Sequence, residues 1–248
     1  MRLWEGWVRH GPLALHFLTG VPSLAEGHGT PLLIVPALAE AAEDYADLLQ
    51  ALAPRPCFAL SLRGRGQSSA PTHGYTLADH VSDLEAFVAA LEPPPFCLLG
   101  CGHGVVYALA YAARWPDRLA GLIVGDHPAS QPALPPGWVE DFLGSTWRNL
   151  PVSERMMCHV VEGLQREAEE VSLWEALPGI TCPALILYGG QPGAGLALPE
   201  VERYLQLLPD ARVWRLPESG GCLWEPDYAQ AVLAIGAFLH RLDEAGRS

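Results

Sequence analysis

Short apolar runs alternate along the chain with segments whose apolar residues recur every three or four positions. The runs at 31–35, 57–61 and 96–99 are apolar almost throughout, which is typical of strands that helices cover on both faces. Helical spacing is clear from Thr76 to Leu91, where Thr76 stands at the N-cap position with Asp79 three residues on. The alternation predicts an α/β protein with a mostly parallel central sheet and helices on both faces.

The same pattern predicts the remaining elements. Residues 2–20 are expected to form a hairpin with Gly11 and Pro12 in its turn. Further strands are expected at 119–124, 183–188 and 212–216, and further helices at about 41–52, at 104–114 and from Tyr228 to Leu242.

Residues 130–177 interrupt this rhythm. A proline-rich loop is followed by short helix-like pieces that carry the aromatic residues Trp138, Phe142 and Trp147. We therefore predict a small helical cap at 130–177, inserted into a core domain made of 1–129 and 178–248.

Charge narrows the range of partners. The formal net charge is −13, and every basic residue apart from the histidines is arginine. An acidic surface does not favour nucleic acid or an anionic membrane as a partner. No apolar run approaches the length of a membrane span, and the first residues lack the apolar stretch of a signal peptide. We expect a cytoplasmic protein that binds neither nucleic acid nor membrane.

The cysteine pattern does not indicate a metal site. The six cysteines include no C-x-x-C pair, and several lie in apolar strand-like runs where a reduced cysteine behaves as a small apolar side chain. A site built from Cys101, His103 and Cys222 matches no zinc spacing. We expect reduced cysteines, no metal and no cofactor.

Four short motifs along the chain are typical of one fold. Residues 100–104 read Gly-Cys-Gly-His-Gly, directly after a buried strand and directly before a helix rich in alanine. Residues 61–68 read Ser-Leu-Arg-Gly-Arg-Gly-Gln-Ser, and further motifs lie at 75–84 and 115–122. Together these segments resemble the α/β-hydrolase superfamily along almost the whole chain, most closely its small cap-bearing esterases and lactonases. The resemblance implies the α/β-hydrolase fold, with a nucleophile elbow at 100–104.

The resemblance also locates the family's catalytic positions in this sequence. The nucleophile position matches Gly102, the acid position matches Pro192 and the histidine position matches Gly221. The His-Gly pair that shapes the family's oxyanion hole matches Pro36 and Ala37. None of these residues supplies a nucleophile, an imidazole or a carboxylate, so the resemblance implies a degenerate catalytic triad.

Several polar or reactive residues are expected around the former site. The candidate pocket residues are Pro36, Ala37, Leu38, Cys101, Gly102, His103, Asp126, His127, Trp147 and Cys222. One interpretation makes Cys222 or Cys101 a relocated nucleophile with His127 as its base. In the other interpretation Cys101 is a packing residue and His103 caps the following helix. Asp126 and His127 then form local hydrogen bonds in a turn.

The leading functional hypothesis is a non-hydrolytic pseudoenzyme that binds a small apolar ligand or a protein partner. The backbone N–H of His103, at a helix N-terminus, would still attract a carbonyl or carboxylate group. The alternative is an enzyme of another type, such as a lyase, cyclase or isomerase, or a weak hydrolase, that uses His103, Asp126 or His127 for proton transfer. The sequence does not decide whether the chain forms an oligomer.

Overall fold

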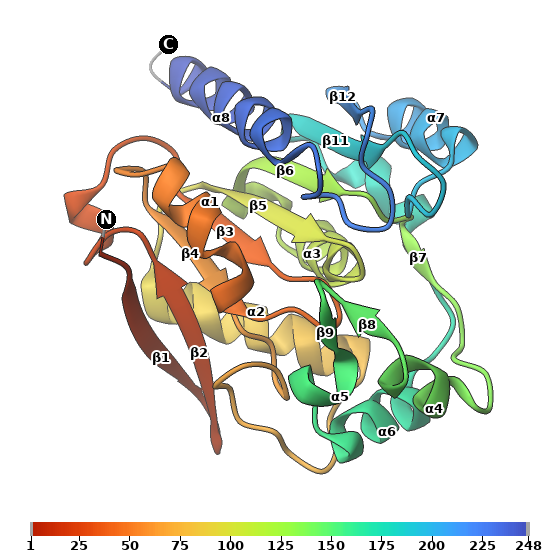
Figure 1. Cartoon of the computed structure of the whole chain (residues 1–248). Coiled ribbons are helices and arrows are strands. Elements are labelled where there is room, and N and C mark those ends of the chain that lie inside the picture. The colour runs from red at the N-terminus through yellow and green to blue at the C-terminus, as the bar shows by residue number, and fades with distance from the viewer. Residues whose placement is uncertain (1, 247–248) are drawn as a thin grey trace.

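An eight-stranded sheet forms the centre of the computed structural model, which describes residues 2–246 (Figure 1). The spatial order of its strands is β1-β2-β4-β3-β5-β6-β11-β12. These strands are β1 (Trp4–His10), β2 (Leu13–Thr19), β3 (Leu32–Val35), β4 (Cys57–Leu60), β5 (Phe96–Cys101), β6 (Leu119–Gly125), β11 (Ala184–Gly189) and β12 (Ala211–Leu216).

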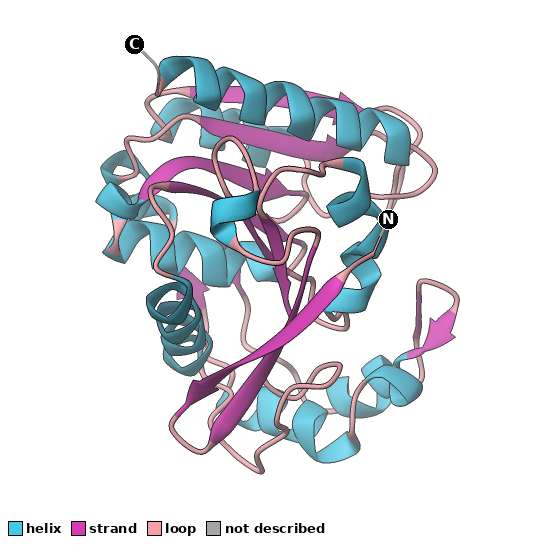
Figure 2. Ribbon diagram, turned by 90° about the vertical axis from the view of Figure 1, so that its left-hand side faces the viewer, coloured by secondary structure: helices cyan, strands magenta, loops and turns pink. Residues whose placement is uncertain are grey.

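All strand pairs from β4 to β12 are parallel, whereas β1 pairs antiparallel with β2, and β2 pairs antiparallel with β4. Figure 2 shows β1 and β2 as a long hairpin that extends beyond the rest of the sheet. The mostly parallel sheet predicted from the sequence is therefore confirmed. In such a sheet the carboxyl ends of neighbouring strands meet at one edge, where ligands usually bind.

Helices cover both faces of the sheet, as predicted. The apolar side chains of α2, α3 and α7 belong to one buried cluster and those of α1 and α8 to another. The helices of these two layers are α1 (Ala46–Ala51), α2 (Leu77–Leu91), α3 (Gly104–Arg114), α7 (Leu198–Leu207) and α8 (Tyr228–Ala245). Three short 3-10 helices join them: η1 (Leu24–Glu26), η2 (Ala42–Tyr45) and η3 (Pro116–Arg118).

A local sequence signal sets the start of α2, whereas the start of α1 differs from the expected one. At the start of α2 the Asp79 N–H donates to Thr76 Oγ1 at 3.1 Å, and the Thr76 N–H donates to Asp79 Oδ2 at 3.1 Å, which is the predicted capping box. The helix expected at about 41–52 instead begins with η2 and becomes α-helical only at Ala46.

Residues 130–177 fold into short elements. These are β7 (Ser130–Gln131), α4 (Trp138–Leu143), β8 (Thr146–Trp147), β9 (Leu150–Pro151), α5 (Val152–Arg155), α6 (Cys158–Glu167), β10 (Val171–Ser172) and η4 (Trp174–Gly179). The helices α4, α5 and α6 lie together at the lower right of Figure 1, whereas the Trp174 ring of η4 packs on Tyr204 of α7 at a centroid distance of 4.8 Å. Val160, Val161 and Leu164 of α6 pack with Tyr75 in a third apolar cluster. We call 130–177 the cap segment; its status as a separate domain stays a prediction.

A buried ion pair holds the 61–68 motif against the rest of the fold. The Arg63 guanidinium donates through Nε and Nη2 to the two oxygens of Asp83 in α2, at 2.6 and 2.7 Å. His10 Nδ1 lies 2.7 Å from Asp83 Oδ1, so the same carboxylate also engages β1. A buried charge is costly unless it is paired, so separating Arg63 from Asp83 is unfavourable. The contact therefore fixes the loop that follows β4.

The structure offers no membrane-spanning helix: within residues 2–246, none is both long enough and apolar enough to cross a bilayer.

A second ion pair joins α8 to the segment before β4 and gives a prediction about pH. Asp243 accepts hydrogen bonds from Arg55 Nη2 at 2.6 Å and from the Thr30 N–H at 2.7 Å. Partial burial acts to raise the pKa of Asp243, but these hydrogen bonds outweigh it and lower the pKa to about 2. The stabilisation is therefore present above the carboxyl's unfolded pKa of about 3.9, and it is lost as the pH falls toward 2.

We expect the variant Asp243→Asn to lower the free energy of unfolding at pH 7, and the difference from the parent to shrink below about pH 4. Urea denaturation of both proteins at a series of pH values measures this. A difference that stays constant from pH 7 to pH 3 would contradict the role assigned to Asp243.

Candidate functional site

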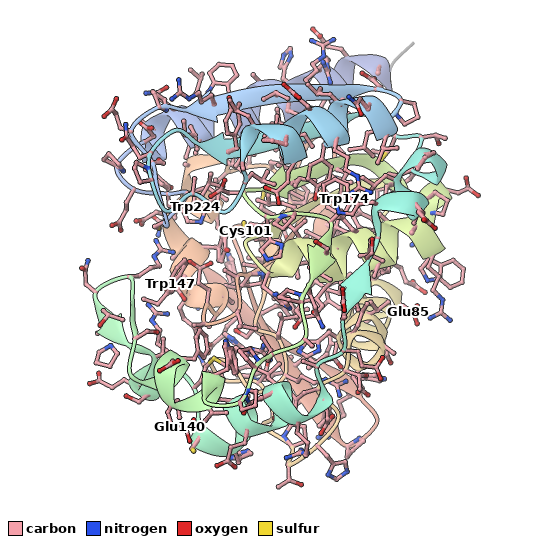
Figure 3. The ribbon with its side chains drawn as sticks, turned by 90° about the vertical axis from the view of Figure 1, so that its right-hand side faces the viewer. Glu85, Cys101, Glu140, Trp147, Trp174 and Trp224 are labelled. Atoms are coloured by element: carbon pink, nitrogen blue, oxygen red, sulfur yellow. The ribbon has the colours of Figure 1, made fainter. Side chains whose placement is uncertain are left out.

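A cavity of about 380 Å³ lies at the carboxyl ends of the strands, between the β5–α3 turn and the cap segment. Its wall is mostly apolar and aromatic. In Figure 3, Cys101 from β5, Trp147 from the cap segment and Trp224 from the loop before α8 lie around it. The other lining residues include Leu38, Glu40, Tyr75, Leu77, Gly102, His103, Tyr107, Asp126, His127, Gln131, Leu134, Trp138, Phe142, Leu164, Ala168, Gly193, Gly221 and Leu223.

The turn from β5 into α3 forms one end of this cavity. Gly102 has a left-handed backbone, with φ +47, and its N–H donates to the Gly125 oxygen at 2.8 Å. The glycines on either side serve close packing: a Cβ at Gly100 would lie 2.6 Å from Val105 Cα, and one at Gly104 would overlap the Pro36 carbonyl oxygen. At Gly102 itself the nearest atom to a Cβ would be the Ala37 methyl, at 3.1 Å. Space therefore admits a side chain at Gly102, but its backbone angle is strained for any residue other than glycine.

Two loops that follow β11 and β12 lie side by side across the cavity. A Cβ at Gly193, which has φ +91, would lie 3.5 Å from the Gly221 nitrogen. Both Gly193 and Gly221 line the cavity, whereas Pro192 is absent from its lining within residues 2–246. The loops that correspond to the acid and histidine loops of the resemblance thus meet at the cavity, and they present glycines to each other.

His103 and His127 are the two imidazoles of the cavity wall, with ring centroids 5.5 Å apart. Burial lowers the pKa of His103 to about 3, with smaller contributions from His127 and Arg65. Burial also lowers the pKa of His127. His127 Nδ1 lies 2.9 Å from the Pro128 carbonyl oxygen, which can only accept, so Nδ1 carries the proton and Nε2 is left as an acceptor. Both rings are neutral at pH 7.

One expectation about His103 is wrong. The residue occupies the N-cap position of α3, but its side chain makes no capping hydrogen bond. The ring instead packs edge-on against Tyr107, at a centroid distance of 5.2 Å, and interacts with Gln131. Its backbone is already helical, so the side chain is directed away from the first-turn N–H groups.

Asp126 holds a loop in place rather than facing the cavity with a free carboxylate. Its two oxygens accept from the backbone N–H groups of Gly189, Gly195 and Leu196, at 3.1, 2.7 and 3.2 Å. Burial raises the pKa of Asp126 and these three donors oppose the rise. The expected local turn is therefore replaced by long-range bonds that fix the segment after β11 beside His127.

Glu40 is a polar residue of the wall that the sequence analysis missed. Its side chain is 1 % exposed, and it accepts from the Tyr45 hydroxyl at 2.5 Å and from Trp147 Nε1 at 3.1 Å. The Ala37 N–H donates at 3.3 Å to Oε2, the oxygen that also accepts from Tyr45, and Arg148 Nη1 donates at 3.5 Å to Oε1. A carboxylate so enclosed joins the loop after β3 to the cap segment. The only signal in the sequence is an acidic residue following an apolar run.

An ion pair between Arg155 and Asp44 also holds the cap segment against the residues that follow β3. Arg155 of α5 donates to both oxygens of Asp44, at 3.0 and 3.1 Å, and to the Ala39 carbonyl oxygen at 3.2 Å. Arg148 donates to the Asp44 carbonyl oxygen at 2.9 Å. Together with Glu40, these contacts fix the cap segment over the cavity.

The two cysteines near the cavity are poor nucleophiles. Burial raises the pKa of both Cys101 and Cys222, so the thiols stay protonated at pH 7. This chemistry does not favour the relocated-nucleophile interpretation.

The structure brings most of the candidate pocket residues together. Those that line the cavity are Ala37, Leu38, Cys101, Gly102, His103, Asp126, His127 and Trp147. Within residues 2–246, Pro36 and Cys222 lie outside the lining. No group of three or more His, Cys, Asp or Glu side chains in that same range is placed to hold a metal ion.

Comparison with known proteins gives one family and two curated relatives. A family model described as the alpha/beta hydrolase fold matches residues 30–147. N-formylmaleamate deformylase from Pseudomonas putida is 27 % identical over 241 residues, which cover 86 % of this chain and 90 % of the relative. Haloalkane dehalogenase from Mesorhizobium japonicum is 41 % identical over 66 residues, which cover 27 % of this chain and 21 % of that enzyme.

Solved structures share the whole architecture at low identity. A haloalkane dehalogenase loop variant from Bradyrhizobium elkanii has a TM-score of 0.79 at 18 % identity, covering 99 % of each chain. Proline iminopeptidase from Mycobacterium smegmatis has a TM-score of 0.77 at 19 % identity, covering 98 % of this chain and 100 % of that one. These likenesses show the fold and leave the chemistry to be argued from the site.

The geometry at Gly102 gives a prediction about stability. The variant Gly102→Ala places a side chain at a left-handed backbone and 3.1 Å from the Ala37 methyl, so we expect it to destabilise the fold by about 1–3 kcal/mol. Adding Ala37→Gly removes the contact but not the backbone strain, and should recover only part of the loss.

Chemical denaturation of the parent, both single variants and the double variant measures the two contributions separately. A Gly102→Ala variant as stable as the parent would contradict the strain, and a double variant with purely additive losses would contradict the contact.

Proposed function

We propose that this chain, which has the α/β-hydrolase fold, is a pseudoenzyme that binds a small, mostly apolar molecule in the cavity beside Gly102 and does not hydrolyse esters. The observation that carries the proposal is an apolar cavity of about 380 Å³ whose wall has glycine, Gly102 and Gly221, where the resemblance expects the nucleophile and the histidine. A pocket of this size and lining is typical of small-molecule sites.

Serine-hydrolase chemistry needs three groups in contact. A nucleophilic oxygen must lie within hydrogen-bond reach of an imidazole, and a carboxylate must orient that imidazole. Gly102, Pro192 and Gly221, the positions that match the triad, carry none of these groups. Neither Asp126 nor the two nearby cysteines replace them, because Asp126 is held by three backbone donors and the thiols of Cys101, on the wall, and Cys222, beside it, are protonated.

The activity named for the curated relative does not transfer directly. The 27 % identical protein is a deformylase by name. Its likeness to this chain extends over most of both sequences, and it supports descent from a hydrolase scaffold. A chain that keeps the cavity of this fold but lacks the nucleophile, imidazole and carboxylate can still bind a small molecule there. Binding is therefore the function that its residues support.

Proton transfer by His127 is the second candidate, and one observation favours it. The ring is neutral, its tautomer is fixed by the Pro128 carbonyl, and Nε2 is left as an acceptor on the cavity wall. A neutral imidazole in this state is a general base. It would serve an isomerase or lyase rather than a hydrolase.

The absence of a nucleophile gives the first test. We expect a fluorophosphonate probe to leave the folded protein unmodified, because the reaction requires an activated serine or an equivalent nucleophile. Intact-protein mass spectrometry after incubation measures this, with a serine hydrolase treated in parallel as the positive control. Stoichiometric labelling of any residue of the cavity would end the pseudoenzyme proposal.

The cavity gives the second test. We expect the small neutral dye prodan to bind with an increase in fluorescence, and Ala168→Trp, which places an indole in the cavity wall, to weaken binding by at least about tenfold. The matched control is Ala229→Trp, on the exposed face of α8. Equal binding by both variants would show that the dye lies elsewhere.

His127 gives the third test. If it transfers protons, acetophenone should exchange its methyl hydrogens with D₂O faster in the presence of the parent than in the presence of His127→Phe, as measured by proton NMR. Equal exchange with both proteins would remove His127 from consideration as a base.

A further inference from the structure

A positive charge lies buried behind the cavity wall without an acidic partner of its own. The Arg65 side chain is 1 % exposed, and its hydrogen bonds go to the Leu38 carbonyl oxygen at 3.0 Å, the Arg63 carbonyl oxygen at 2.6 Å and His80 Nε2 at 3.1 Å. All three acceptors are neutral. Within residues 2–246, Arg65 Nη2 has no hydrogen-bond partner.

The neighbouring acid does not balance this charge. Asp83 is the carboxylate nearest in the network, and it is already bound by two nitrogens of Arg63 and by His10. His80 is neutral, since burial holds its pKa well below the usual range and its Nδ1 donates to the Thr76 carbonyl oxygen at 2.8 Å. Because a guanidinium stays protonated, Arg65 is a charge whose burial needs an explanation.

Arg65 is connected directly to the cavity. Leu38, which accepts from Arg65 Nε, lines it, and Nη2 lies on the same edge of the guanidinium as Nε. His80, which accepts from Nη1, stacks on Tyr107 at a ring distance of 4.3 Å, and Tyr107 also lines the cavity. The Tyr107 hydroxyl lies close enough to the Arg65 guanidinium for the positive charge to act against the rise that burial causes in the pKa of Tyr107.

The hydroxyl hydrogen of Tyr107 is available to donate a hydrogen bond. In its contact with Arg65 the tyrosine oxygen can only accept, because a guanidinium has no lone pair to offer. Among the residues that the structure describes, the group that acts most strongly on this hydroxyl is the Arg65 guanidinium, which cannot take the hydroxyl hydrogen. His103 lies one turn earlier on the same face of α3, and its backbone N–H is likewise unpartnered within the described chain.

We infer that Tyr107, with the buried Arg65 behind it, binds an anionic oxygen of the ligand, so that the cavity selects small apolar molecules that carry one carboxylate or enolate. The inference rests on the proposed function, since it specifies the ligand of the same cavity. The apolar part of the ligand lies against the aromatic wall around Trp138, and its charged end lies against α3.

Two carboxylates of the wall do not oppose this arrangement. Glu40 is enclosed by donors from Tyr45, Trp147 and the Ala37 backbone. Asp126 is bound by three backbone N–H groups. Their charges are therefore compensated by protein donors, whereas the charge of Arg65 is not, and the Arg65 end is where an anion is stabilised.

The test compares matched pairs of probes that differ only in charge. The pairs are phenylacetate, 3-phenylpropionate and 4-phenylbutyrate with their primary amides, and isothermal titration calorimetry measures binding to the parent and to variants. We expect at least one acid to bind about tenfold more tightly than its amide. Tyr107→Phe should remove most of that preference while changing amide affinity less than about threefold.

The matched control is Tyr111→Phe, one turn further along α3, which is buried but lies outside the cavity lining within residues 2–246. It should leave the preference unchanged. Arg65→Gln removes the charge and keeps a donor, and it should abolish the preference if it folds; Tyr107→Phe carries the test if it does not.

The outcomes separate the two proposals. Amides that bind as tightly as the acids in the parent, or a Tyr107→Phe variant that keeps the full preference, overturn the anion site and leave cavity binding intact. If the folded parent binds neither member of any pair, both the anion site and the proposed function are overturned.

Discussion

The close approach of the N-terminus of α3 to the loop after β3 is the constraint on which the site depends. A Cβ at Gly104 would overlap the Pro36 and Val35 carbonyl oxygens, so a glycine is needed there, and a Cβ at Gly100 would meet the backbone of α3 at Val105. Between these two glycines Gly102 has a left-handed backbone, and α3 begins at Gly104. The His103 N–H and, one turn later, the Tyr107 ring then face the cavity from a rigid helix rather than from a mobile loop.

Much of the fold follows from burial alone. A strand covered on both faces must be apolar throughout and a surface helix must be apolar at every third or fourth position, so the periodicity predicted the sheet and its two helix layers. Local chemistry predicted the start of α2, because Thr76 and Asp79 need only each other. Most candidate pocket residues lie at strand ends, and the carboxyl ends of parallel strands meet, which is why the sequence could bring Ala37 and His127 together.

The polar network of the site was beyond the reach of the sequence, because its contacts join positions far apart in the chain. Glu40 meets Trp147 across the cavity, and nothing near either residue signals the partner. The three backbone donors of Asp126 come from a loop some 60 residues later, as the separations of 63, 69 and 70 positions show. Arg65 looked like one basic residue in a loop motif, and only the folded chain shows that its guanidinium lacks an acid.

Three of the glycines that line the cavity, Gly102, Gly193 and Gly221, have a consequence for protein engineering. A Cβ at Gly102 would have one neighbour within 3.4 Å, the Ala37 methyl, and Cβ atoms at Gly193 and Gly221 would meet only ordinary contacts at 3.5 and 3.4 Å. The backbone thus leaves space for a side chain at each of these positions, of which Gly102 and Gly221 match the nucleophile and the histidine of the resemblance and Gly193 follows Pro192. The chain is thus suited to the design of an active site. Reacting side chains can be introduced one at a time, and the activity that each adds can be measured against a parent that lacks them.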